Sequence, residues 1–173
     1  RKNDESDANR YQTIYARDEG SVAAPTAGLH FTQEIFDRLK EKGIQQAFLT
    51  LHVGAGTFKP VKASTMAGHG MHAEWIDVTN TFIQQLIDQY PKPVVAVGTT
   101  SLRTLESLYW MGVKTALDPS LQQLSLAQWE VYEPLLADTN ISLGEALRAL
   151  LNWLDRNKRD RLFTQSQILI APG

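Results

Sequence analysis

The sequence predicts an α/β fold in which helices flank a mixed, partly parallel sheet. Two observations support this class. Segments with the apolar spacing of amphipathic helices alternate with short β-branched runs that are typical of strands, and turns rich in glycine or proline separate them. Hydrophobic residues make up 43% of the 173 residues and charged residues 21%, which is enough apolar material for a core. We therefore expect a single α/β domain over 1–173, with 1–9 as a polar lead-in.

Four helices are expected, because four segments combine helical apolar spacing with a recognisable start or stop residue. They cover 32–43, 80–91, 101–112 and 142–154. The fourth has the clearest start, since Ser142 and Glu145 form a capping box. Gly43 and Gly112 are expected to end the first and third helices.

Three strands are expected at 47–53, 93–97 and 167–171. The run 93–97 is compact and β-branched, which is typical of a strand covered on both faces. The alternation of strands with helices indicates at least some parallel pairs. The stretch 118–140 has no regular pattern, so we expect an insertion or a linking segment there.

The charge balance and the missing residue types exclude several classes. The 17 basic and 19 acidic residues give a net charge of −2, which argues against a stand-alone module that grips nucleic acid through phosphates. Cysteine is absent, so disulfides and thiolate metal sites are excluded. The apolar runs are too short to cross a bilayer and the polar N-terminus shows no signal peptide, so we expect a cytoplasmic protein without membrane contact. A basic cluster suits either a solvated helix end or an RNA backbone; it consists of Arg156, Lys158, Arg159 and Arg161.

All four histidines lie between positions 30 and 72, in segments dense in glycine, threonine or proline. Around His30, the small residues of 23–32 let backbone amides approach an anion at a helix start, although a plain loop is the alternative. Around His52, a strand runs into the glycine turn 54–57, where open α/β sheets commonly bind ligands. His52 can equally be an ordinary strand residue.

The third segment places His69, His72 and Glu74 within six residues. Two imidazoles and a carboxylate can bind a divalent metal. Alternation along an extended segment, however, puts His72 and Glu74 on one face and His69 on the other. Acid–base or hydrogen-bonding work is therefore favoured, and no metal site is expected.

The fourth segment, 97–107, reads as a strand, a turn and a helix start. Its turn, Gly98-Thr99-Thr100, offers amides and hydroxyls to an anion. Arg103 can hold a carboxylate or phosphate, and the alternative is a surface pair between Arg103 and Glu106.

These segments, in this order, resemble the S-adenosylmethionine:tRNA ribosyltransferase-isomerase family. The matching stretches are 10–16, 20–32, 49–58, 69–75 and 97–107. The resemblance implies that the ribosyl part of S-adenosylmethionine is transferred to the 7-aminomethyl-7-deazaguanine at the wobble position of the tRNA anticodon and isomerised. Epoxyqueuosine-tRNA forms, and adenine and methionine leave. We expect S-adenosylmethionine as co-substrate, no permanently bound cofactor, tRNA as partner and a monomeric enzyme.

That chemistry needs proton donors and acceptors near the leaving adenine and the incoming amine, and donors for the methionine carboxylate. The expected catalytic pool is His30, His52, His69, His72 and Glu74. The residues expected to bind substrate are Pro25, Thr26, Gly28, Gly54, Gly56, Thr57, Gly98, Thr99, Thr100, Arg103 and Glu106.

The chain departs from the family pattern in two ways. The stretch 118–164 does not match it, and the family's β-barrel domain and a later segment are missing. We therefore expect an excised part of a larger two-domain enzyme that turns over little alone. Two rival classes stay open: a non-catalytic adenosyl- or tRNA-binding domain, and a metal-dependent hydrolase built on His69, His72 and Glu74. A branch that acts on another acceptor is a third possibility.

Overall fold

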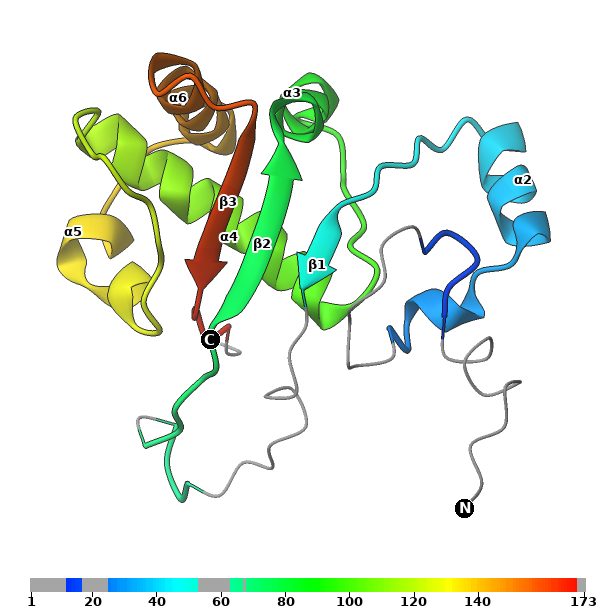
Figure 1. The fold of residues 1–173 in the computed structure, drawn as a ribbon, viewed down its shortest axis with the longest axis horizontal. Coiled ribbons are helices and arrows are strands. Elements are labelled where there is room, and N and C mark those ends of the chain that lie inside the picture. Colours follow the sequence, from blue (N-terminus) through cyan, green and yellow to red (C-terminus); the bar gives the residue numbers. More distant parts are fainter. Residues whose placement is uncertain (1–11, 17–24, 53–62, 67, 171–173) are drawn as a thin grey trace.

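The computed structural model describes residues 12–16, 25–52, 63–66 and 68–170, which form a small sheet with helices packed on one face (Figure 1). The strands are β1 (Thr50–His52), β2 (Glu74–Thr79) and β3 (Arg161–Ser166). The longer helices are α2 (Gln33–Glu41), α3 (Asn80–Gln89), α4 (Thr99–Leu117) and α6 (Leu143–Arg156). The short ones are η1 (Gly28–His30), η3 (Glu130–Tyr132) and α5 (Pro134–Ala137). The α/β class is confirmed.

The sheet has the order β1-β2-β3, and both pairs of neighbours are antiparallel. Alternate residues of β2 and β3 are buried, as the two-residue period of a strand requires. The buried positions include Ile76, Val78 and Leu162, and they face α3, α4 and α6. The other face of the sheet is not covered by a described helix (Figure 1).

The core lies between this sheet and the crossing of α4 with α6. Trp153 of α6 is fully buried, and its indole nitrogen donates to the carbonyl of Leu121 at 2.6 Å. Gly112 of α4 lies against the backbone of Ala146, whose Cα would be 3.0 Å from a Cβ at position 112. The glycine therefore permits close helix packing, which explains why α4 continues past it to Leu117 although we expected the helix to end there.

All four predicted helices are confirmed. The Thr32 hydroxyl caps α2, Gly43 follows that helix with a φ of 68°, and Ser142 with Glu145 caps α6 from both sides. The cap of α3 is Thr79, one residue before the expected Asn80. The stretch 118–140 holds the short η3 and α5.

The strand predictions were less accurate. The segment 47–53 contains β1, although Val53 lies outside the described residues. The run 93–97 is not a strand: Val94 is 51% exposed and Val95 86%. No strand occurs over the described part of 167–171, because the sheet already ends at Ser166.

The expectation of parallel pairs is wrong for the sheet that the structure describes. Both of its ladders are antiparallel, and an isolated bridge between Leu126 and Ser166 is parallel. The β-branched run 93–97 finds no strand to pair with among the described residues, and β3 enters from α6 beside β2 instead. None of the described helices combines the length and the apolar character needed to span a bilayer.

Candidate functional site

Three charged or ionisable side chains meet where β2 begins and α4 starts. The Glu74 carboxylate is only 4% exposed, and its Oε1 lies 2.9 Å from Nε2 of His72. Its Oε2 contacts the Arg103 guanidinium in an ion pair. A carboxylate withdrawn from water is costly unless it is paired in this way. We call His72, Glu74 and Arg103 the carboxylate cluster.

The strand and helix periods explain this meeting. Glu74 is the first residue of β2, and alternation turns it inward with Ile76. Arg103 and Ser107 lie one helical turn apart on α4, so both face the sheet. Ser107 Oγ lies 2.7 Å from Ser166 Oγ, and Ser166 pairs with Glu74 across the sheet. The cluster is thus the outer end of a buried polar stripe.

The segment before β2 is held by two glutamines. The Met71 amide donates to Gln128 Oε1 at 2.8 Å, and the Met71 carbonyl accepts from Gln167 Nε2 at 3.2 Å. Gln128 also donates through its amide to the carbonyl of His69. These bonds fix the backbone beside His72, so the position of its imidazole does not depend on the contact with Glu74 alone.

The hydrogen bond to Glu74 determines the tautomer of His72. A carboxylate that is ionised beside Arg103 can only accept hydrogen bonds, so Nε2 of His72 must donate. In the neutral imidazole the basic nitrogen is then Nδ1. The arrangement of carboxylate, imidazole and reacting group is the usual way to orient a general base.

Two segments that are far apart in the sequence meet beside α4. Gly98 precedes the helix with a φ of 94°, a conformation that favours glycine. A Cβ placed there would lie 3.9 Å from the Cβ of Ala27. Gly28 is buried against Tyr15, whose burial raises the pKa of its hydroxyl. The segment of Pro25, Thr26 and Gly28 therefore borders the turn of Gly98, Thr99 and Thr100.

The other expected catalytic histidines lie elsewhere. Among the described residues, His30, His52 and His69 make no hydrogen bond or ion pair with the carboxylate cluster. His30 is exposed at the end of η1, and His52 lies edge-on to Phe163 on the uncovered face of the sheet. For these three histidines the catalytic role stays a prediction.

The remaining expected residues divide into two groups. Gly54, Gly56 and Thr57 lie outside the described residues. Glu106 is half-buried. Arg103 forms its ion pair with Glu74, so the surface pair between Arg103 and Glu106 that the sequence also suggested does not form. The Tyr109 hydroxyl donates to the carbonyl of Ile141; burial raises its pKa, and the Glu106 charge adds to that shift.

No group of three metal-ligating side chains occurs in the described part of the chain. The metal-dependent hydrolase therefore gains no support from these residues.

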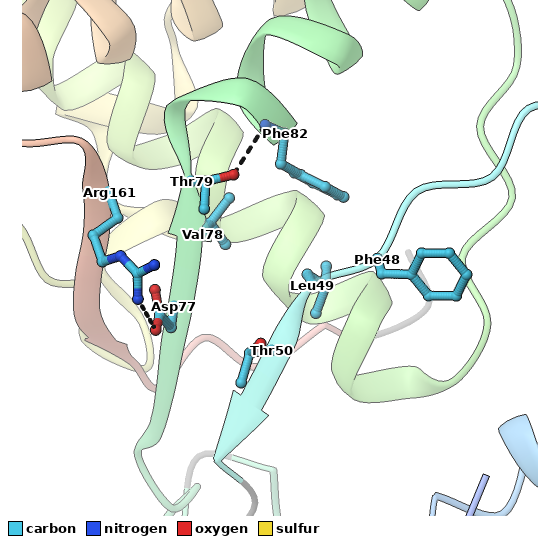
Figure 2. A pocket seen from close by; sticks show the side chains of 8 residues that line it. All are labelled: Phe48, Leu49, Thr50, Asp77, Val78, Thr79, Phe82 and Arg161. Atoms are coloured by element: carbon cyan, nitrogen blue, oxygen red, sulfur yellow. Dashed lines mark hydrogen bonds and ion pairs between the residues drawn. The ribbon is translucent and has the colours of Figure 1, made fainter. Parts of the chain in front are cut away.

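A hollow of about 80 Å³ lies at the edge of the sheet, between β1, the end of β2 and the start of α3 (Figure 2). Arg161 donates to Asp77 at 2.9 Å on one side of it, and Phe48 and Leu49 lie on the other. Small-molecule sites usually occupy a few hundred Å³ or more, so this hollow is too small for an adenosyl group. Sequence reasoning placed Arg161 in the basic cluster but missed its pairing with Asp77, because that pairing depends on the register of β3.

Comparison with known proteins identifies a matching family and similar relatives. The family described as "Queuosine biosynthesis protein" matches residues 1–141. A relative from Rickettsia rickettsii (strain Sheila Smith), named S-adenosylmethionine:tRNA ribosyltransferase-isomerase, is 57% identical over 107 residues, which are 61% of this chain and 29% of the relative. A Rickettsia felis protein of the same name is 56% identical over 115 residues, 65% of this chain and 31% of the relative.

The matched part of the chain thus spans less than a third of the length of these relatives. No solved structure matches. The family match, however, extends over far more than half of the 173 residues. On that ground the chain belongs to the queuosine biosynthesis protein family.

Proposed function

We propose that this chain is part of a tRNA-modifying transferase-isomerase. The enzyme moves the ribosyl part of S-adenosylmethionine onto 7-aminomethyl-7-deazaguanine in the anticodon loop, gives epoxyqueuosine and releases adenine and methionine. The relatives' shared name supports the reaction. The observation that carries it on this chain is the buried carboxylate cluster beside the Gly98 turn, because it joins an oriented imidazole to two segments of small residues.

His72 is the proposed general base. The reaction needs a proton removed from the attacking amine or from the carbon beside the sulfonium. Glu74 holds the Nε2 proton of His72 and stabilises the imidazolium that forms when Nδ1 takes up a further proton. Glu74 is thus a positioning residue that acts through His72.

Arg103 and the adjoining turn are the proposed anion site. A guanidinium carries five N–H donors, so the ion pair with Glu74 leaves donors for the carboxylate of the methionine part. Thr99 and Thr100 add hydroxyls and the first amides of α4, where the helix dipole favours negative charge. We assign Pro25, Thr26 and Gly28 to the facing wall.

The proposed complete enzyme has a larger sheet than the described part of this chain. We propose that the run 93–97 becomes a strand of a larger, partly parallel sheet when the remaining polypeptide is present. The exposure of Val94 and Val95 supports this, because two exposed β-branched residues offer an apolar surface to a neighbour. The 173-residue chain alone should therefore turn over little, and the complete enzyme is proposed to work as a cytoplasmic monomer.

Joining the chain to the flanking segments of the Rickettsia rickettsii relative tests the function. We expect the joined protein to release adenine from S-adenosylmethionine only when an anticodon stem-loop carrying the 7-aminomethyl base is added. The unjoined chain and an RNA with unmodified guanine serve as controls. If a folded joined protein released no adenine while the intact relative did, the proposal would be refuted.

A further inference from the structure

The uncovered face of the sheet has an unusual composition. The outward positions of β2 and β3 are Trp75, Asp77, Thr79, Arg161, Phe163 and Gln165. None of these six residues is aliphatic. A sheet face that packs on another layer of protein is usually rich in valine, isoleucine and leucine, as the covered face of this sheet is. Aromatic and polar residues in alternation fit a different kind of partner.

Two of these residues form an exposed aromatic stack. The ring centroids of Trp75 and Phe163 lie 4.7 Å apart with the planes inclined by 14°, and the rings belong to neighbouring strands. Trp75 is 42% exposed and Phe163 52%. His52 stands edge-on to Phe163, with the ring centroids 6.3 Å apart. Large exposed rings on a sheet, flanked by polar side chains, are what single-stranded nucleic acids use to stack their bases.

Positive charge gathers at the end of the sheet where β3 begins. Arg156, Lys158, Arg159 and Arg161 are all exposed, and the segment 156–161 contains one carboxylate, that of Asp160. The chain as a whole has a net charge of −2, so this cluster is a local excess. Arg161 belongs both to the cluster and to the uncovered face, and its partner there is Asp77. A phosphate backbone is the complement of such a cluster.

We propose that the uncovered sheet face binds unpaired bases of an RNA loop, which stack on Trp75 and Phe163 while the phosphates run toward residues 156–161. The proposal rests on the function above, which supplies the anticodon loop as the RNA. Trp75 directly follows Glu74 in β2, so the stack and the carboxylate cluster lie at the same end of one strand, on its two faces. A loop can therefore stack one base while another reaches the end of the strand.

Fluorescence anisotropy of a labelled anticodon stem-loop, with the 173-residue chain, tests this. The reference ligand is a duplex with the same stem sequence but without the unpaired loop. Trp75→Leu and Phe163→Leu keep apolar bulk but remove the ring, and each should weaken loop binding about tenfold, while Trp75→Tyr retains most of it. Trp129→Leu is the matched control, because Trp129 is 38% exposed but lies outside the sheet, and it should leave binding unchanged.

Each other outcome overturns the inference. Equal affinity of the wild-type chain for loop and duplex would exclude a stacking site, as would unchanged binding by Phe163→Leu. Self-association that Trp75→Leu abolishes, without RNA binding, would identify the face as a protein interface. Circular dichroism verifies that each variant is folded. If Trp75→Leu does not fold, Phe163→Leu provides a second variant, because Phe163 is exposed on the edge strand β3.

The same assay separates this inference from the proposed function. Stack-dependent RNA binding without adenine release from the joined protein would leave the RNA surface standing and remove the function. If Trp75→Leu changed neither the KM for the stem-loop nor the kcat of adenine release, the proposed function would stand and the RNA surface would be refuted.

Discussion

Helices α6 and α2 were predicted from the same kind of signal, a capped amphipathic segment, yet they differ in how far their apolar sides are buried. In α6 the apolar side is buried against α4 and the sheet, with Leu150 and Trp153 fully inaccessible. In α2 no residue is buried, and among the described residues Phe36 contacts the rings of Tyr15, Phe31 and Phe48. The difference teaches that an amphipathic pattern specifies a helix, whereas the partner that buries it has to be present in the chain.

The run 93–97 resembles α2 in this respect. Both carry apolar residues in a pattern that predicts burial, and in neither is any residue buried. The matched part of the chain spans less than a third of the length of its relatives, and for 93–97 we proposed above that a neighbouring strand comes from the remaining polypeptide. The predictions below test whether α6 and α2 differ in energy as they differ in packing.

Trp153→Ala should have the largest effect on stability. Removing a fully buried indole leaves a cavity and an unpaired carbonyl at Leu121, and the loss in free energy of unfolding should be about 4 kcal/mol. Urea unfolding of the chain measures it. Trp129→Ala, at a partly exposed position, is the control and should cost far less. Equal losses would mean that α6 is not the centre of the core.

Phe36→Ala should have an intermediate and local effect. Phe36 contacts the rings of Tyr15, Phe31 and Phe48 at centroid distances between 5.5 and 6.2 Å, but α2 buries no residue. We expect a change in global unfolding of about 1 kcal/mol or less, together with faster hydrogen exchange confined to α2. Slower exchange of α2 than of α6 in the wild-type chain would contradict the comparison.

Val95→Thr should change little in the chain alone. Its side chain is 86% exposed, so the free energy of unfolding should stay within about 0.5 kcal/mol of wild type. In the protein completed with Rickettsia flanks the same substitution should destabilise, because the position would then be covered. A measurable loss in the isolated chain, or no loss in the completed protein, would argue against a covering strand.

The smallest effect concerns pH and the start of α6. Hydrogen bonds from the Ser142 hydroxyl and amide hold the pKa of Glu145 below its ordinary value of 4.5. A carboxyl whose folded pKa is depressed stabilises the fold above the unfolded pKa, and that contribution is lost as the pH falls through the folded value. The stability difference between wild type and Ser142→Ala should therefore shrink in acid. A difference that is independent of pH would exclude the hydrogen bond from the Ser142 hydroxyl to the Glu145 carboxylate as its cause.

The sequence was a good guide to the helices because their caps and spacing are local. Thr32, Gly43, Ser142 and Glu145 all act within one turn of the helix that they delimit. The strands were harder to predict, since their identity depends on pairing. β3 consists mainly of polar residues, and only its alternate burial against β2 and α4 shows that it is a strand.

In the candidate site, too, contacts within one segment were predictable and contacts between distant segments were not. Alternation predicted that His72 and Glu74 share a face, and the hydrogen bond between them agrees with that. Arg103 reaches Glu74 from a different element, and local reasoning offered the nearer Glu106 instead. The stack of Trp75 on Phe163 was missed because it depends on a register between strands that are far apart in the sequence.

Single-turnover release of adenine by the completed enzyme, compared between wild type and His72→Gln, tests the proposed base most directly. We expect His72→Gln to slow release about 100-fold or more while the enzyme stays folded and still binds the stem-loop. Glu74→Gln should slow it less, because the imidazole remains but is no longer held beside a carboxylate. A wild-type rate in folded His72→Gln would contradict the role of the carboxylate cluster in the chemistry.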